Sequence, residues 1–316
     1  MTNLEKMKDF LKKGRIHKFS LNNPHINWQK KKHLQRILKA GQMENKFLFL
    51  PVDHGIEHGP SDFLGSLWAV NPEEQLELAL QGRYSGIVFH IGLAQKYWQK
   101  PKYKKNIPLL LKLNGKTNIP SDEEAFSPLT STVKDAVKIG ADAVGYTLYV
   151  GSPRQDEDFL QFLKVRQEAE QAGLPVVTWA YPRGKFAKEK GGKDTIAFVA
   201  YAARLGAELG SDIIKINAPK PVKAGRYDPN GDFALYNELL ELSDQEQLAW
   251  AVANACSTGV LVSGGSKLGD EDMLNKVKMA VAAGVDGLIF GRNMWQRPLK
   301  EALEITKKVK KILTQR

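Results

Sequence analysis

Cysteine is nearly absent from this chain of 316 residues, which contains Cys256 alone. One cysteine excludes an intrachain disulfide and a thiolate metal cluster. The sequence also lacks an apolar run long enough to cross a bilayer, and no signal-peptide core follows Met1. We therefore expect a cytoplasmic protein with no membrane partner.

Motifs for nucleotides and nucleic acids are missing as well. No Gly-x-Gly-x-x-Gly follows the first predicted strand, which argues against a dinucleotide-binding fold, and no cofactor is expected. The net charge of +11 suits acidic ligands such as phosphates. Because the lysines are spread over most of the predicted helices, we interpret them as solvated helix faces and expect no nucleic-acid partner.

Residues 1–46 are dense in lysine and precede any predicted strand. Apolar side chains recur there at helical spacing, for example in Leu4, Met7 and Leu11. This pattern predicts a helical extension that packs across one end of the next domain, and a basic arm for a polyanion is the alternative. Residues 47–316 are predicted to form a single catalytic domain.

From Phe47 onward, short apolar segments alternate with longer amphipathic ones. The segments predicted as strands are residues 47–53, 86–90, 109–113, 143–149, 175–181, 212–217, 259–263 and 287–290. Helices are predicted over residues 72–81, 131–139, 156–172, 196–209 and 271–283. Eight such units favour an α/β fold with a closed (β/α)8 TIM barrel over an open doubly wound sheet.

A lysine lies within one predicted buried strand, Asp212-Ile213-Ile214-Lys215-Ile216-Asn217. Burial disfavours the charged form of lysine, and a neutral amine can attack a carbonyl to form a Schiff base. Lys215 is therefore a candidate nucleophile. The alternative is a structural lysine whose ammonium reaches solvent or pairs with an acid.

Polar side chains at other strand ends are expected to meet Lys215, because barrel enzymes carry their sites at the C-terminal ends of the strands. Asp53 ends the first strand, Lys112 lies in the third, and Tyr181 shares one face of the fifth with Trp179. We expect Lys112 to depress the pKa of Lys215 by repulsion, so that protonation becomes unfavourable for both lysines.

The last two strands run into glycine-containing loops, each followed by a cationic side chain. These loops read Ser263-Gly264-Gly265-Ser266-Lys267 and Gly291-Arg292-Asn293. Glycines expose backbone N–H groups, and in barrels these two loops often hold a phosphate. Plain turn glycines are the alternative interpretation.

Together these motifs resemble the archaeal-type class I fructose-bisphosphate aldolases, a Schiff-base barrel family with relatives that act on other phosphorylated ketoses. The resemblance runs from about Phe47 to Arg297 and rests on six segments: residues 53–60, 112–116, 179–184, 212–215, 263–265 and 291–297. It implies that Lys215 forms the Schiff base. It also implies that Tyr181 transfers protons and that Asp53 binds substrate hydroxyls and assists the transfer.

Substrate binding is assigned on the same basis to a larger group of residues. They are Lys112, Trp179, Arg183, Ser263, Gly264, Gly265, Gly291 and Arg292. The chain departs from the family after Lys215, where Asn217 and Ala218 replace a basic residue and an aromatic one. Lys220 or Arg183 is therefore expected to complete a second phosphate site.

The resemblance implies cleavage of fructose 1,6-bisphosphate to dihydroxyacetone phosphate and glyceraldehyde 3-phosphate, and the reverse condensation. It also implies a phosphorylated sugar substrate, a place in glycolysis and gluconeogenesis, and a homo-oligomer. Other readings stay open: a related Schiff-base aldolase, transaldolase or condensing enzyme, and a non-enzymatic phosphate-binding barrel. Zinc catalysis through Asp53, His54, Glu57 and His58 is a further rival, but no metal is expected, because too few ligands converge.

Overall fold

The computed structural model describes residues 2–14 and 18–315. Eight parallel strands pair in chain order, and the last pairs with the first to close a barrel. The predicted (β/α)8 barrel is therefore confirmed. The strands are β1 (Phe47–Pro51), β2 (Gly86–Phe89), β3 (Leu109–Lys112), β4 (Ala143–Val150), β5 (Val176–Pro182), β6 (Ile213–Ile216), β7 (Gly259–Ser263) and β8 (Gly287–Ile289).

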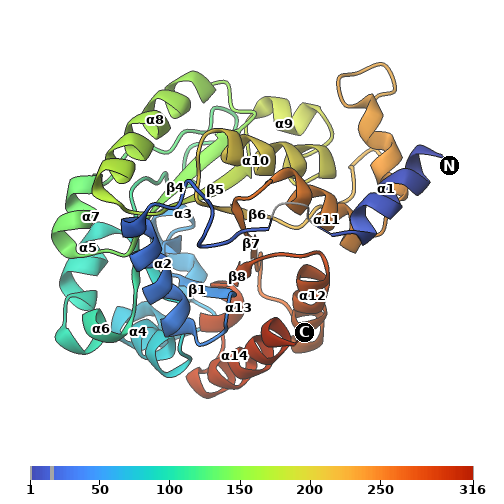
Figure 1. The fold of residues 1–316 in the computed structure, drawn as a ribbon. Coiled ribbons are helices and arrows are strands. Elements are labelled where there is room, and N and C mark those ends of the chain that lie inside the picture. Colours follow the sequence, from blue (N-terminus) through green and yellow to red (C-terminus); the bar gives the residue numbers. More distant parts are fainter. Residues whose placement is uncertain (1, 15–17, 316) are drawn as a thin grey trace.

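Helices surround these strands on all sides (Figure 1). The α-helices are α1 (Asn3–Lys12), α2 (Trp28–Gly41), α3 (His54–Glu57), α4 (Pro72–Gln81), α5 (Ile91–Leu93), α6 (Pro101–Asn106), α7 (Val133–Ile139), α8 (Gln155–Ala172), α9 (Lys185–Glu189), α10 (Ile196–Glu208), α11 (Asp244–Asn254), α12 (Asp270–Ala282), α13 (Arg292–Trp295) and α14 (Leu299–Thr314). Shorter helical turns are η1 (Pro60–Phe63), η2 (Leu67–Val70), η3 (Ala94–Trp98) and η4 (Ala234–Glu241). Helix α4 begins and ends at the predicted residues, and no described helix is long and apolar enough to span a membrane.

The side chains of each strand alternate between the barrel interior and the surrounding helices. Phe47, Phe49 and Val88 belong to the interior cluster, which also contains Trp179. Leu48 and Leu50, between them in β1, belong instead to the cluster shared with the outer helices. This alternation also turns Lys112 and Lys215 inward, since each lies two residues from an interior side chain of its own strand.

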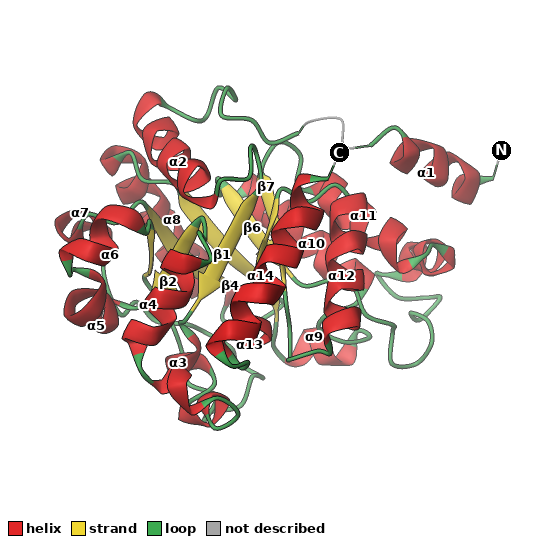
Figure 2. Cartoon of the chain, turned by 90° about the horizontal axis from the view of Figure 1, so that it is seen from below, coloured by secondary structure: helices red, strands yellow, loops and turns green. Residues whose placement is uncertain are grey.

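Helix α2 closes the N-terminal end of the barrel. Its apolar residues Leu34, Ile37 and Leu38 join the same buried cluster as Phe47 and the other interior side chains. Figure 2 shows α2 at one end of the strands, with α3, α9 and α13 toward the other end. The predicted packing of an N-terminal helix across one end of the barrel is thus confirmed, whereas a domain boundary at residue 46 stays a prediction.

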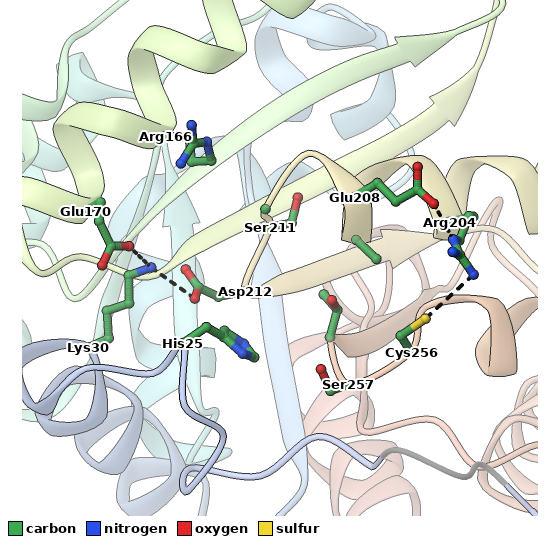
Figure 3. Close-up of a pocket in the computed structure, with 13 residues that line it drawn as sticks. His25, Lys30, Arg166, Glu170, Arg204, Glu208, Ser211, Asp212, Cys256 and Ser257 are labelled. Atoms are coloured by element: carbon green, nitrogen blue, oxygen red, sulfur yellow. Dashed lines mark hydrogen bonds and ion pairs between the residues drawn. The ribbon is translucent and has the colours of Figure 1, made fainter.

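Ion pairs fasten α2 to this end of the barrel (Figure 3). Lys30 is 4% exposed and its Nζ lies 3.1 Å from Oδ1 of Asp212 and beside the carboxylate of Glu170. Asp212 also accepts the backbone N–H of Val176 at 2.8 Å, so its carboxylate links three elements. Arg36, which lies further along α2, pairs with Asp142, which precedes β4.

Candidate active site

A pocket of about 420 Å³ lies at the C-terminal ends of the strands. It brings together most of the predicted site residues, namely Asp53, Tyr181, Arg183, Lys215, Ser263, Gly264, Gly265, Gly291 and Arg292. Two predicted residues do not line it. Lys112 and Trp179 are fully buried in the layer beneath the pocket, with no side-chain surface for a ligand to touch.

Lys215 projects from the end of β6 into this pocket and is 6% exposed. Its Nζ lies 5.0 Å from the ring centroid of Trp179 and 5.3 Å from that of Tyr181. Burial lowers the pKa of Lys215 to about 8, with a smaller lowering by Lys112, against the opposing attraction of Asp53 and Glu57. A sizeable fraction of the amine is therefore neutral near physiological pH.

Lys112 lies beneath the pocket and differs from Lys215 because two carboxylates pair with it. Its Nζ lies 2.9 Å from Oε1 of Glu57 and 3.3 Å from Oδ2 of Asp53. Burial opposes its charge, but the attraction of Glu57 and Asp53 is stronger and raises its pKa above the usual value. The expectation that protonation is unfavourable for both lysines is therefore wrong, whereas the predicted repulsion by Lys112 is one of the causes that lower the pKa of Lys215.

Tyr181 and Trp179 stand on the same face of β5, as the alternation predicted. Trp179 pairs in register with Lys215 of β6, and its ring centroid lies 4.7 Å from Nζ of Lys112 and 5.0 Å from Nζ of Lys215. Burial, with the negative charge of Glu57, raises the pKa of Tyr181 well above its usual value. Tyr181 is therefore a neutral phenol in the free pocket and can donate a proton to a nearby atom.

The loops after β7 and β8 present unused hydrogen-bond donors. The backbone N–H groups of Gly264 and Gly265 donate to no residue that the structure describes. Gly265 has a φ of +73°, and a Cβ on Gly291 would lie 2.5 Å from Cε1 of His54, so both backbones depend on glycine. Arg292 follows with a buried Nε that has no partner among the described residues.

A second group of cations lines the pocket at the ends of β5 and β6. Lys220 lies 3.0 Å from Asp194, and Nε of Arg183 lies 3.7 Å from Asp122. Asp194 also accepts from the amide of Asn217 at 2.8 Å, which turns the Oδ1 atom of Asn217 toward the hydroxyl of Ser263. Lys220 and Arg183, the residues expected to complete a second phosphate site, both line the pocket.

Three further charged side chains of the pocket were not among the predicted site residues. Glu57 was considered only within the first strand's motif and as a candidate zinc ligand, and Asp194 and Lys276 were not singled out at all. Asp194 and Lys276 line the pocket, as does Glu57. A carboxylate or lysine on a helix or loop gives no local signal of this kind, because its contacts involve residues distant in the chain.

Metal ligands are not gathered in this pocket. Across residues 2–14 and 18–315, no three His, Cys, Asp or Glu side chains are grouped so that they could hold one ion. His54, one of the candidate ligands, has its pKa lowered to about 4 by burial and lies 3.7 Å from Asp53. The site offers an amine, a phenol and two glycine loops with backbone N–H groups.

A parallel barrel with a buried, weakly basic lysine at its mouth defines a class of enzymes that form covalent intermediates with carbonyl compounds. Residues 47–297 match the DeoC/LacD family aldolase model, and the chain belongs to this family.

Named relatives agree with this assignment. The chain is 37% identical over 275 residues to the class 1 fructose-bisphosphate aldolase of Thermoproteus tenax, covering 86% of this chain and 91% of that protein. It is 39% identical over 254 residues to the enzyme of the same name from Halobacterium salinarum, covering 80% and 86%.

A solved structure is similar over the whole barrel. It is an archaeal fructose-1,6-bisphosphate aldolase with the catalytic Lys covalently bound to the carbinolamine intermediate of the substrate. The TM-score is 0.74 and the identity 34%, over 90% of this chain and 100% of the other.

Proposed function

We propose that this chain is a class I aldolase that cleaves fructose 1,6-bisphosphate into dihydroxyacetone phosphate and glyceraldehyde 3-phosphate, and catalyses the reverse condensation. The observation that supports this most directly is Lys215, buried beside Tyr181 with a pKa lowered to about 8. The family and the two relatives named above point to the same reaction.

The proposed reaction begins when the neutral amine of Lys215 attacks the C2 ketone. Loss of water leaves a protonated imine, which accepts the electron pair of the C3–C4 bond when the C4 hydroxyl loses its proton. Glyceraldehyde 3-phosphate departs and an enamine stays on Lys215. Protonation at C3 and hydrolysis of the imine then release dihydroxyacetone phosphate and restore the amine.

Tyr181 is assigned to the proton transfers. Its ring lies 5.3 Å from Nζ of Lys215, so formation of a charged imine places a positive charge beside the phenol. This charge favours the phenolate and offsets part of the burial that raises the pKa in the free pocket. In the proposed sequence Tyr181 first donates its phenolic proton to the carbinolamine hydroxyl, which leaves as water. The resulting phenolate then accepts the C4 hydroxyl proton and returns it to C3.

The two cation groups fit the two ends of a bisphosphate. Gly264, Gly265 and Arg292 are assigned to one phosphate, and Arg183 with Lys220 to the other. Both groups line the pocket that contains Lys215. Binding energy at the phosphates positions the ketone without taking part in bond cleavage.

The proposal also includes the pathway, the cellular location and the oligomeric state of the enzyme. Its substrates are intermediates of glycolysis and gluconeogenesis, which supports a cytoplasmic location. A homo-oligomer is supported by exposed apolar side chains on neighbouring helices: Val137 of α7 is 54% exposed, and Leu160 and Leu163 of α8 are 70% and 41% exposed.

Borohydride trapping tests the covalent step. Reduction of the imine should attach dihydroxyacetone phosphate to the peptide that contains Lys215, detected by mass spectrometry, and should abolish activity. Lys215→Met should be neither labelled nor active. Lys112 should stay unlabelled, because Glu57 and Asp53 keep it protonated. A wild-type chain that cleaves the sugar without any trapped lysine would refute the mechanism.

A further inference from the structure

Helix α12 places an additional cation, Lys276, in the same pocket. Its Nζ donates to the carbonyl oxygen of Gly264 at 3.1 Å. It also lies 3.7 Å from the position that a Cβ on Gly265 would occupy. An ammonium group carries three donors, and the described residues use only this one.

Lys276 is partly buried and differs from the buried Lys30 and Lys112 because no carboxylate pairs with it. It forms no ion pair with any described residue, whereas Lys30 and Lys112 pair with two carboxylates each. Asp194, whose charge reaches Lys276, is already bound by Lys220 at 3.0 Å. Burial and the repulsion of Lys220 lower the pKa of Lys276 to about 8. This partly buried cation therefore lacks a counter-ion among the described residues.

We propose that Lys276 binds a substrate phosphate, together with Arg292 and the backbone N–H groups of Gly264 and Gly265. This inference rests on the proposed function and adds a ligand to one of its phosphate sites. A phosphate monoester carries nearly two negative charges at neutral pH. Arg292 alone supplies one positive charge and lies 3.9 Å from Asp62, which takes up part of it. Lys276 supplies the missing charge.

A purely structural role would confine Lys276 to its hydrogen bond with Gly264. Two variants separate these roles. Lys276→Gln keeps a donor for the Gly264 carbonyl and loses the charge, whereas Lys276→Met loses both. Lys278→Met is the matched control, because Lys278 lies two residues further along α12 and is exposed.

The experiment compares borohydride trapping by dihydroxyacetone phosphate with trapping by dihydroxyacetone, which has no phosphate. Both Lys276 variants should need about tenfold or more dihydroxyacetone phosphate for half-maximal labelling, as expected for loss of a charge-assisted contact. Labelling by dihydroxyacetone should match the wild type, and Lys278→Met should behave like the wild type with both ketones.

Other outcomes overturn the inference. Unchanged labelling by dihydroxyacetone phosphate would remove Lys276 from the site, and equal weakening with both ketones would make its role structural. If wild-type protein is trapped by neither ketone, the proposed function has failed instead. Calorimetry with inorganic phosphate then decides about Lys276 independently, since Lys276→Gln should weaken that binding about tenfold and an unchanged affinity refutes the contact.

Discussion

A buried lysine lies at each end of β6, and the charges around the two lysines differ. At the N-terminal end, Lys30 meets the carboxylates of Asp212 and Glu170 and fixes α2 to the barrel. At the C-terminal end, Lys215 forms no ion pair with a described residue, and burial lowers its pKa to about 8. The same side chain is thus structural at one end and reactive at the other, according to which charges surround it.

Lys112 shows that a position at the C-terminal end of a strand does not by itself lower the pKa of a buried lysine. It lies above the same barrel interior as Lys215, yet Glu57 and Asp53 raise its pKa. Its charge then acts on the neighbours: it lowers the pKa of Asp53 and contributes to the lowered pKa of Lys215. A lysine that stays protonated, Lys112, therefore lies beneath the pocket, whereas Lys215 within the pocket can lose its proton near pH 8.

The largest expected effect comes from exchanging Lys215. Lys215→Met should lower kcat by roughly 10⁴-fold or more, because no imine can form. The variant should unfold at an equal or higher urea concentration than the wild type at pH 7, since it removes a buried cation that forms no ion pair. A variant that keeps its turnover would show that the two ends of β6 do not differ as described.

Tyr181→Phe tests the partner of Lys215 at the same end. The ring is kept and only the hydroxyl is lost, so imine formation should persist while kcat falls by roughly 10² to 10⁴-fold. Borohydride labelling and steady-state turnover, measured on the same preparation, separate the two steps. Full turnover in this variant would assign proton transfer to another group.

Lys30→Met tests the other end, where the effect should fall on stability. Asp212 would be left buried without its cation, which should cost about 3 kcal/mol of the free energy of unfolding. Urea unfolding measures this change, and kcat should stay within about twofold of wild type because the pocket is at the far end of the strands. Lys32→Met, on an exposed position of α2, serves as the control.

The pH dependence of kcat/KM gives the smallest expected effect. The reactive form of Lys215 is the neutral amine, so kcat/KM should rise about tenfold per pH unit below pH 8 and level off above it. An ordinary lysine would extend that rise beyond pH 10.

The lowered pKa of Lys215 should also make the free energy of unfolding depend on pH. The cost of burying the protonated amine is fully present below pH 8 and is relieved as the pH rises toward 10.5, because the unfolded chain keeps its proton longer. The wild type should therefore gain stability relative to Lys215→Met between pH 7 and pH 9.5, as measured by urea midpoints. A constant difference would show that Lys215 has an ordinary pKa.

The barrel was predictable because its signal is local. Alternating apolar strands and capped amphipathic helices repeat along the chain, and β7 begins and ends where the sequence predicted. Helix α11 was not predicted, although Ser243 and Glu246 form a capping box at its start. The sequence around η4 offers no comparable periodic signal.

The site was predictable only in part, for a physical reason. Lys215 stands out because a charge interrupts an apolar strand, and the glycine loops stand out by composition. The pairing of Glu57 with Lys112 joins residues 55 positions apart, and its strength depends on distance and burial that the sequence does not contain. The raised pKa of Lys112 and the pocket position of Lys276 follow from such contacts.

The attachment of α2 also governs the order in which the chain can fold. Lys30 and Asp212 are separated by 182 residues, so Lys30 cannot pair with Asp212 until most of the barrel strands have been made. At synthesis rates of about 5 to 20 residues per second, Asp212 follows Lys30 by roughly 10 to 40 s. During that interval the apolar face of α2, with Leu34 and Ile37, has no barrel to cover it. Helix α2 is thus made before the strands that it packs against, and we expect nascent chains to be prone to aggregation until β6 has been made.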